Sequence, residues 1–468
     1  MKKFIYSIIA ITLLVSVTSC DKESLEPTLA QIKDVATSIK TVDDLQGILF
    51  GAYNRMTNYN YYGRNVIIYG EVRSDNAFAD GNSARLTTVS NMDMLYTDSD
   101  ASATWTQIYT VIASTNVIIG ADLDKITGDA TKIDHIIGQA YAIRALAHFD
   151  LLRIYGQQHV TTGQNIGVPY VKTYKGSKET LFPIRNTVAE CKQFIMEDLT
   201  TATSKMSTSL NDNSKQLMTT YGAQALAARV ALYFKDWTTA KSMASIVIAS
   251  NKYSIIDANK YAASWSIDGS VNSIFELGYS NIDNEWINGL ANIYRYSDYG
   301  DVRALPNILT IFDDNDVRGG TVAGTAMIDW DAVANFKLRN IGKYPSRSFD
   351  DNVPLIRYEE VILIYAEAAL ETGDAATALI YLNMVPAKRG ANLYTIADKD
   401  NILLERRKEL CFEGFRFDDL ARTNSDIPLS DPVLQTHGGP AYGSYKYAFP
   451  IPQVEMLANS NMVQNYGY

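Results

Sequence analysis

The feature that most constrains the fold is a stripe of small and aliphatic side chains at helical spacing. Between Ile136 and Tyr155, apolar residues recur at intervals of three and four, which places them on one face of an α-helix. Helices of this kind are stable only when their apolar faces pack together, so the sequence predicts a mainly helical body. The same periodicity is present over residues 41–56, 103–119, 188–202, 221–234 and 237–247.

Two of these regions have the form of a helix hairpin. An Ala-rich helix ends in a short polar turn and a second Ala-rich helix begins, at residues 235–240 and again at residues 373–378. Small residues where two helices cross allow close packing, which is the basis of tetratricopeptide repeats. A continuous array repeats this unit about every 34 residues, and the two turns are much farther apart. The sequence therefore predicts a few tetratricopeptide-like helix pairs that form a scaffold, with long irregular insertions.

The N-terminus has the organisation of a bacterial secretory signal. Two lysines precede an apolar run over residues 4–17, and small residues then lead to Cys20. The run is shorter than the roughly 20 residues that a membrane-spanning helix needs. Residues 17–20 resemble a lipobox, where a peptidase cuts before the cysteine and the new terminus is acylated. We expect a signal peptide over residues 1–19 and a lipid on Cys20; the alternatives are a plain signal peptide or a membrane anchor.

The segment behind Cys20 is charged and sparsely apolar. It supplies little surface for a core, so we interpret residues 20–39 as a flexible tether and residues 40–468 as the folded body. Acidic residues close behind the cysteine also resemble the export signal of surface-exposed Bacteroidetes lipoproteins. This predicts an outer-membrane lipoprotein that faces the cell exterior.

Charge and cysteine usage exclude two further classes. The formal net charge is −10 and becomes more negative once the signal peptide is removed, so the chain repels the phosphate backbone of nucleic acids. Only Cys191 and Cys411 remain behind Cys20, too few for a disulfide framework. Both lie in segments of helical character, where we favour buried free thiols over a bridge.

Aromatic residues are concentrated in two regions with little helical periodicity, residues 53–69 and 253–299. In the second region they alternate with Asn, Asp, Ser and Gly. Aromatic faces flanked by amides and hydroxyls suit ligands with apolar C–H patches and many hydrogen-bonding groups, such as sugars or peptides. Packing in an irregular core is the alternative for any single ring. The candidate ligand-binding residues are Trp286, Tyr294, Tyr296, Trp265 and Tyr62.

The sequence contains no recognisable catalytic constellation. The four histidines lack metal-ligand spacing, and neither a Gly-rich phosphate loop nor a Gly-x-Ser-x-Gly elbow is found. Residues 313–316 resemble part of a calcium loop, but Val317 and Arg318 interrupt the pattern of oxygen ligands. We therefore expect a protein that is not an enzyme, with no cofactor and no metal site.

A charged segment over residues 405–422 is predicted to be structural. It holds five acidic and five basic side chains, with opposite charges at helical spacing, such as Glu405 with Lys408 and Arg406 with Glu409. Interleaved apolar residues would draw part of the set into low dielectric, where charges must be paired. Balanced charge of this kind favours an ion-pair clamp over a catalytic group.

This segment also resembles the C-terminal signature of the SusD/RagB family, nutrient-binding lipoproteins of Bacteroidetes. The sequence departs from the family pattern at Pro386 and Lys388, where Asn-x-Val-Arg-x-Arg is usual. Other blocks that resemble the family follow in the expected order, at residues 105–119, 144–156, 167–170, 315–318, 343–344, 354–368, 449–452 and 464–468.

The resemblance implies four tetratricopeptide-like helix pairs that support an irregular ligand-binding part, which we place notably within residues 250–350. It also implies a partner, a SusC-like TonB-dependent outer-membrane barrel, over which the protein forms a lid. The expected function is capture of oligosaccharides at the cell surface and delivery to that barrel. Peptide capture by the same architecture is one alternative, and a periplasmic scaffold without a small ligand is another. No binding residue carries over, because the family motifs lie in the scaffold.

Overall fold

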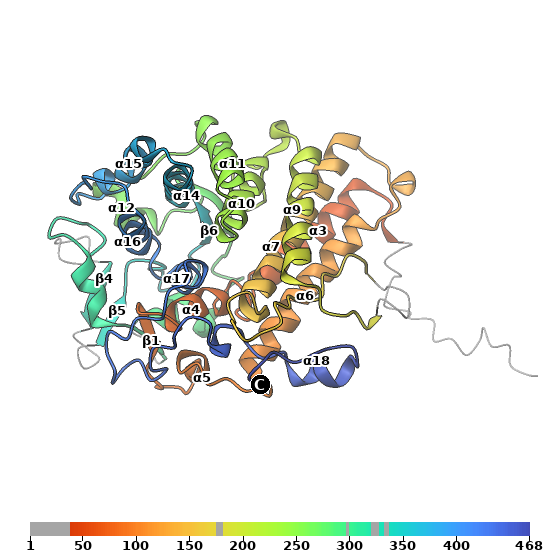
Figure 1. The fold of residues 1–468 in the computed structure, drawn as a ribbon. Helices are drawn as coiled ribbons and strands as arrows, with labels where there is room; N and C mark the ends of the chain where they lie inside the picture. The colour runs from red at the N-terminus through yellow and green to blue at the C-terminus, as the bar shows by residue number, and fades with distance from the viewer. Residues whose placement is uncertain (1–37, 175–180, 296–298, 320–326, 332–336) are drawn as a thin grey trace, which may run out of the picture.

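The computed structural model describes residues 38–174, 181–295, 299–319, 327–331 and 337–468, and helices dominate these ranges (Figure 1). The predicted signal peptide, Cys20 and nearly all of the predicted tether lie outside them. Within the described ranges, no helix combines the length and the apolar composition needed to cross a membrane. The longer helices are α3 (Val42–Met56), α6 (Ser99–Ile119), α7 (Ala130–Tyr155), α9 (Val188–Lys205), α10 (Thr220–Tyr233), α11 (Trp237–Ala249), α14 (Tyr358–Glu371), α15 (Ala375–Met384) and α16 (Lys399–Leu410).

The shorter elements connect these helices or cover them. The strands pair as antiparallel two-stranded sheets, namely β1 (Ala77–Ala79) with β3 (Val302–Ala304), β2 (Ser273–Leu277) with β6 (Val353–Arg357), and β4 (Ile328–Asp331) with β5 (Lys337–Asn340). The short helices are α4 (Asn65–Val72), α5 (Thr87–Ser90), α12 (Ala258–Ser264), α13 (Leu290–Tyr294), α17 (Arg416–Arg422) and α18 (Gln453–Ala458), with 3-10 turns η2 (Leu123–Lys125), η3 (Thr208–Leu210), η4 (Trp286–Asn288), η5 (Pro306–Ile311), η6 (Pro386–Lys388) and η7 (Tyr445–Tyr447).

Several helices begin at capping signals in the sequence. At the start of α3, the Thr41 hydroxyl accepts a hydrogen bond from the Asp44 N–H, and the Asp44 carboxylate accepts one from the Thr41 N–H. Thr187 and Glu190 form the same capping box at α9. Each box satisfies backbone donors that the first turn of a helix leaves free, which fixes where the helix begins.

Both predicted helix hairpins are confirmed. Helix α10 turns into α11 at Lys235, whose φ is 59°, and α14 turns into α15 at Gly373, whose φ is 86°. The aspartate that follows, Asp236 or Asp374, accepts a hydrogen bond from the backbone N–H three residues on and so caps the second helix. The same local chemistry therefore closes both hairpins.

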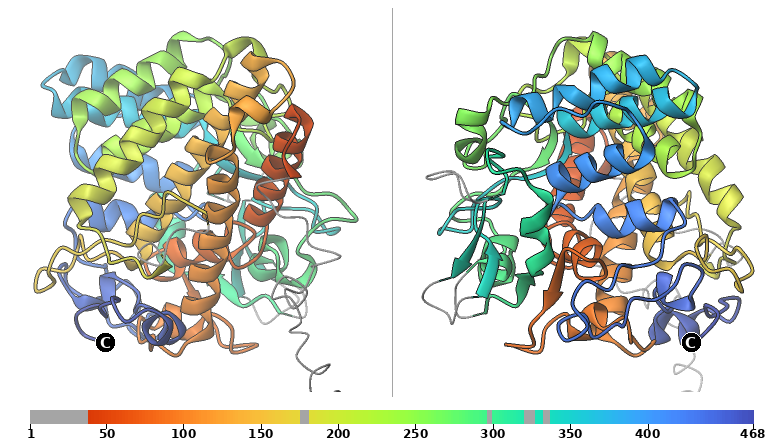
Figure 2. Two further views of the ribbon diagram at one scale, coloured as in Figure 1. Left: turned by 90° about the vertical axis from the view of Figure 1, so that its right-hand side faces the viewer. Right: turned by 60° about the vertical axis from the view of Figure 1, so that its left-hand side comes forward.

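The long helices form one array that is continuous in space. Contacts run from α3 to α6, α7, α9, α10, α11, α14 and α15, with each helix packed on the next (Figures 1 and 2). The chain leaves this array after α11 and returns to it at α14, so the two hairpins are neighbours although their sequences are far apart. The mainly helical, tetratricopeptide-like scaffold with long insertions is thus confirmed.

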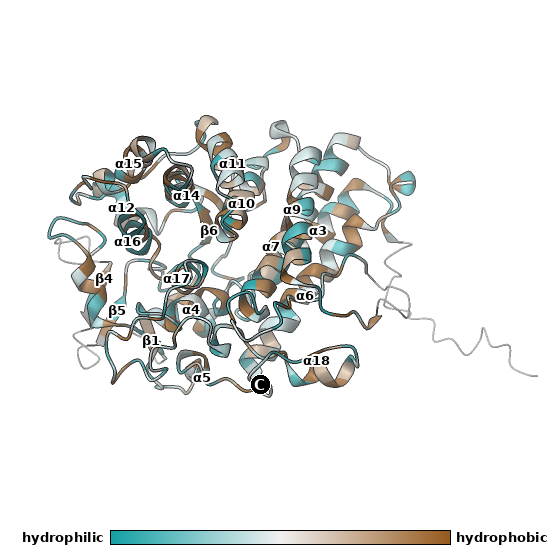
Figure 3. Cartoon of the chain, viewed as in Figure 1, coloured by the Kyte–Doolittle hydropathy of each residue, from teal (hydrophilic) through white to brown (hydrophobic). Residues whose placement is uncertain are grey.

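The core lies inside the array and between the array and the insertions. Each scaffold helix carries both apolar and polar residues (Figure 3), as expected for a helix that buries one face and exposes the other. The stripe predicted on α7 is buried, including Ile143, Leu151 and Ile154. Burial of each such side chain stabilises the fold by about 1.5–3 kcal/mol. Cys191 and Cys411 are buried free thiols, in agreement with the sequence-based preference.

Candidate functional site

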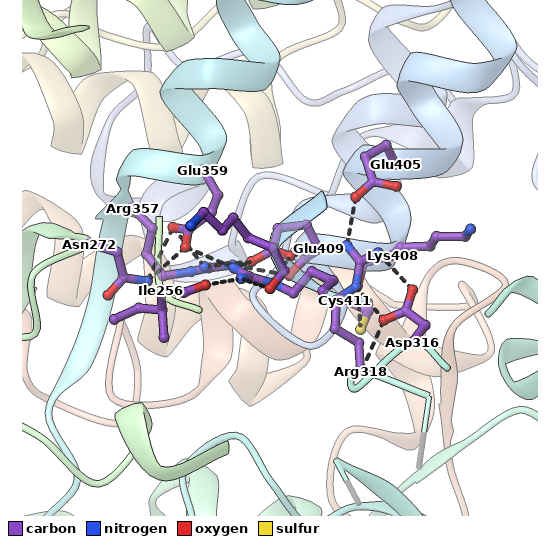
Figure 4. A network of polar contacts seen from close by, with 12 residues as sticks. Ile256, Asn272, Asp316, Arg318, Arg357, Glu359, Glu405, Lys408, Glu409 and Cys411 are labelled. Carbon is purple, nitrogen blue, oxygen red and sulfur yellow. Dashed lines mark hydrogen bonds and ion pairs between the residues drawn. The ribbon is translucent and has the colours of Figure 1, made fainter. Parts of the chain in front are cut away.

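The charged segment 405–422 forms a buried ion-pair network around Glu409 of α16 (Figure 4). Its carboxylate accepts hydrogen bonds from Arg357 at 2.8 Å, from Arg389 at 2.9 Å and from Arg318 at 3.1 Å. All four side chains are at most 3% exposed. Burial by itself raises the pKa of Glu409, but the charges of the three arginines hold that pKa well below its ordinary value. The Glu409 carboxylate is therefore ionised and is held in place by three guanidinium groups.

The predicted clamp is confirmed, but its predicted pairing is wrong. Glu405 binds Arg318 at 2.7 Å, and Arg406 binds Asp419 at 2.9 Å. The expected neighbours on the same helix do not pair, because α16 is enclosed and its side chains meet partners from other segments. Arg318 comes from the insertion, whereas other members of the network come from the start of α14 and from the segment behind α15. The clamp therefore holds the insertion on the scaffold.

The structure separates the candidate ligand-binding residues by exposure. Trp286, the first residue of η4, is 68% exposed. Tyr62, Trp265 and Tyr294 are 4%, 8% and 1% exposed, and they pack in the core. Tyr296 lies outside the described residues. A ring enclosed by protein cannot stack on a ligand without a rearrangement, so of the four candidates that the structure describes, only Trp286 has the exposure that a contact residue needs.

The burial of Tyr294 has a clear physical reason. Its ring stacks on Tyr344, with centroids 6.2 Å apart, and its hydroxyl donates to the Phe412 carbonyl oxygen at 3.3 Å. Near Tyr294, Gly289 caps α13 and Asn292 lies within that helix, so small and amide residues surround a packed ring. The same composition around Trp286 belongs to η4, where the ring is exposed. Local composition does not distinguish the two cases.

Around Trp286, the two aromatic regions of the sequence meet. The loop over residues 279–289 lies against the turn over residues 57–64, and the Tyr279 hydroxyl donates to the Thr57 carbonyl oxygen at 2.8 Å. The backbone of Tyr59 donates a hydrogen bond to the Glu285 carboxylate. Segments more than 200 residues apart in sequence thus share one face of the molecule.

Two arginines pack against aromatic rings next to this face; Arg64 is buried and Arg85 is partly exposed. The guanidinium of Arg64 lies 4.8 Å from the ring centre of the half-buried Tyr59, and that of Arg85 lies 4.0 Å from the ring centre of Tyr299. Arg64 also interacts electrostatically with Glu285 and with Arg85. Cation–π contacts of this kind fix the orientation of an aromatic ring. Sequence reasoning missed both arginines, because nothing in the local sequence pairs Arg85 with Tyr299.

The backbone of Trp286 is strained. Its φ is 49°, in the left-handed region that bulky residues rarely adopt. Hydrogen bonds hold it there: the Trp286 N–H donates to the Asn284 side-chain oxygen at 2.9 Å, and the Gly289 N–H donates to the Trp286 carbonyl oxygen at 3.1 Å. Strain of about 1–3 kcal/mol persists only where the surroundings enforce it, and such residues cluster at functional sites.

The described residues show no grouping of three or more His, Cys, Asp or Glu side chains suited to a metal ion. The calcium-like sequence at residues 313–316 is used differently. The Asp316 carboxylate binds the guanidinium of Arg318 at 2.7 Å, so its charge is already neutralised within the clamp.

A helical-repeat scaffold that presents an exposed aromatic and polar face is the architecture of a binding protein. Two family models match the chain. One is described as "Starch-binding associating with outer membrane" and matches residues 26–232, and the other, the SusD family, matches residues 337–468. The chain belongs to the SusD/RagB family.

Two relatives match this chain over nearly its whole length, and a third matches part of it. SusD-like protein P2 of Formosa agariphila is 25% identical and covers 99% of both chains. A crystal structure of a putative sugar binding protein from Bacteroides vulgatus has a TM-score of 0.81 at 29% identity, and it covers 92% of this chain and 100% of that one. The starch-binding protein SusD of Bacteroides thetaiotaomicron is 29% identical, over 33% of this chain and 28% of its own length.

Proposed function

We propose that this protein is a lipid-anchored, cell-surface binding protein that captures oligosaccharides and delivers them to a SusC-like TonB-dependent barrel. The observation that carries the proposal is the exposed ring of Trp286, which stands beside the partly exposed polar side chains of Asn284 and Glu285. A sugar ring offers apolar C–H groups to an aromatic face and hydroxyls to the polar groups around it. The names of relatives that bind starch or sugar support the same class of ligand.

Trp286 provides the direct test of ligand capture. Calorimetric titration with neutral, amino and acidic oligosaccharides and with peptides would identify the class that binds. We expect Trp286→Ala to weaken oligosaccharide binding about five- to thirtyfold, since one stacking contact contributes about 1–2 kcal/mol. The matched control is Tyr466→Ala, which removes a 53% exposed ring from the C-terminal segment. Unchanged binding by Trp286→Ala, or binding of peptides alone, would contradict the proposal.

The anchor and the partner are tested in cells. With residues 1–19 as signal peptide and residues 20–39 as tether, Cys20→Ala should lose acylation and leave the outer-membrane fraction, because stable anchoring needs more than one acyl chain. Mild-detergent pull-down of the wild-type protein should recover a large β-barrel transporter. Protease added to intact cells should cut the protein. Protection from protease, together with no recovered barrel, would instead favour a periplasmic scaffold.

A further inference from the structure

A small pocket lies behind the Trp286 loop. It is enclosed by the turn at residues 57–64, the loop at residues 279–289 and a third segment at residues 344–353, and its lining includes Glu285, Tyr344 and Asp351. Gly289, whose N–H binds the Trp286 carbonyl oxygen, also lines it, so the strained tryptophan lies beside the pocket. The cavity volume is about 20 Å³, which is room for a single water-sized group.

One group in the lining has an unused hydrogen-bonding capacity. Tyr344 is 1% exposed, and its hydroxyl has no hydrogen-bond partner within the described part of the chain. A buried hydroxyl without a partner destabilises a fold, and native structures rarely keep one without a reason. A group that enters the pocket and binds this hydroxyl supplies such a reason.

The two carboxylates in the lining also lack full compensation. Burial raises the pKa of Asp351 to about 6, against the hydrogen bond from the Ser346 N–H, and Asp350 and Asp268 add to the rise while Arg295 opposes it. Burial likewise raises the pKa of Glu285, against the Tyr59 hydrogen bond and the charge of Arg64, while Asp283 adds to the rise. Both carboxylates would gain from another hydrogen-bond donor.

Strained backbone surrounds the same pocket. Tyr344 and Phe349 line it and Trp286 flanks it, and their φ angles are 59°, 62° and 49°. Each is a bulky aromatic residue in a region that favours glycine. Neighbouring packing has to enforce all three conformations. The surrounding fold therefore maintains the shape of this pocket at a cost in backbone strain.

We propose that this pocket is a specificity subsite for one hydrogen-bond-donating group, a hydroxyl or an ammonium, of a sugar ring that stacks on Trp286. The inference rests on the proposed function. The donor binds the Asp351 carboxylate, the Tyr344 hydroxyl completes the contact, and the negative charge of Glu285 in the same lining adds to the attraction. A carboxylate or sulfate substituent is too large for the pocket and is repelled by its two acids.

Tyr344→Phe isolates the subsite, because it removes only the unpartnered hydroxyl. We expect affinity for the best-binding neutral oligosaccharide, chosen from glucan, xylan, mannan and galactan fragments, to fall about tenfold. Thermal stability should stay equal or rise, since an unsatisfied polar group is lost. The control is Tyr261→Phe, which removes another buried hydroxyl without a partner among the described residues, at a place away from this pocket. It should leave affinity unchanged.

Ligand chemistry gives the second readout. At pH 7.5 the wild-type protein should bind an amino-sugar oligosaccharide at least as well as its neutral counterpart, and a uronic acid counterpart at least tenfold more weakly. Asp351→Asn should reduce this discrimination. In the wild-type protein the preference for the amino sugar should shrink as the pH falls through 6, where Asp351 becomes protonated.

The outcomes separate this inference from the proposed function. If Trp286→Ala weakens binding while Tyr344→Phe and Asp351→Asn do not, the capture face stands and the subsite is refuted. Equal binding of neutral and uronic acid oligosaccharides also refutes the subsite. If no oligosaccharide binds the wild-type protein, the proposed function fails and the subsite fails with it.

Discussion

At the scale of single residues, the carboxylate of Glu409 forms ion pairs with three buried arginines and neutralises part of their charge. Removal of one partner from a buried ion network leaves charge uncompensated in low dielectric, which costs about 3–5 kcal/mol. We therefore expect Glu409→Gln to lower the free energy of unfolding by that amount in urea titrations.

The control for Glu409 is an exposed pair. Glu371 lies 3.3 Å from Lys399, and both side chains are partly solvated. Glu371→Gln should change the free energy of unfolding by about 1 kcal/mol or less, since exposed ion pairs contribute little. Equal effects of the two substitutions would mean that the clamp does not stabilise the fold.

The raised pKa of Asp351 makes the stability of the fold depend on pH. The sign of this dependence is opposite to that produced by a salt-bridged carboxylate. For Asp351, the folded-state pKa of about 6 lies above the ordinary aspartate value of 3.8, so between these values the folded protein binds more protons than the unfolded chain. Stability from this group is therefore present at low pH and is lost as the pH rises through about 4 to 6. After allowance for solvent screening, the effect is about 1–2 kcal/mol.

Asp351→Asn should remove this contribution. The amide oxygen can still accept the Ser346 N–H, so the variant should be about 1–2 kcal/mol more stable than the wild type at pH 7 and nearly equal to it at pH 4. Thermal unfolding across this pH range measures the difference. Asp124→Asn, an exposed position, is the control. A variant that is less stable at pH 7 would overturn the assignment.

At the scale of elements, the hairpin turn at Gly373 can be tested without any change in packing. A Cβ at Gly373 would meet no atom within 4 Å, so Gly373→Ala costs only the strain of an alanine at φ 86°. We expect about 1 kcal/mol of destabilisation in chemical denaturation. Gly47→Ala in α3 also meets no atom within 4 Å but lies in a regular helix, so it should stabilise by about 0.5–1 kcal/mol. Effects of the same sign would contradict the backbone argument.

The elements also show what sequence alone can predict. Helices such as α3 and α9 were predictable because a capping box and an apolar stripe are local signals. The contact between α11 and α14 was not, since it joins segments separated by the whole insertion. The same limit explains the wrong pairing in the clamp, where Glu405 binds Arg318 from that insertion.

The candidate site was likewise only partly predictable from the sequence. The composition around Trp286 predicted an exposed aromatic ring, and the same signal failed for Tyr294, because packing against Tyr344 decides its burial. Arg64 and the pocket residue Asp351 had no signal in the sequence. Their role follows from three distant segments that meet on one face.

At the scale of the whole molecule, the proposed function gives the predicted tether a role in how far the body can move relative to the barrel. Seventeen residues lie between Cys20 and Ser38, where the described structure begins, and a fully extended chain of this length spans up to about 60 Å. That reach is comparable to the diameter of a body of this size, for which the expected radius of gyration is about 22 Å. If the proposed lipid anchor is present, a tether of this length would let the body tilt away from a barrel while it stays attached to the membrane.

Deletion of residues 24–35 should therefore impair uptake without impairing capture. We expect the purified variant to bind oligosaccharide with wild-type affinity, because Trp286 and its pocket are unchanged, while cells that carry it import the same oligosaccharide more slowly. Replacement of residues 24–35 by Gly and Ser of equal length should restore uptake, since reach depends on length and stiffness more than on side chains. Normal uptake by the shortened protein would show that the body does not need to move on its anchor, and failure of the Gly/Ser replacement would show that the natural sequence of the tether is itself recognised.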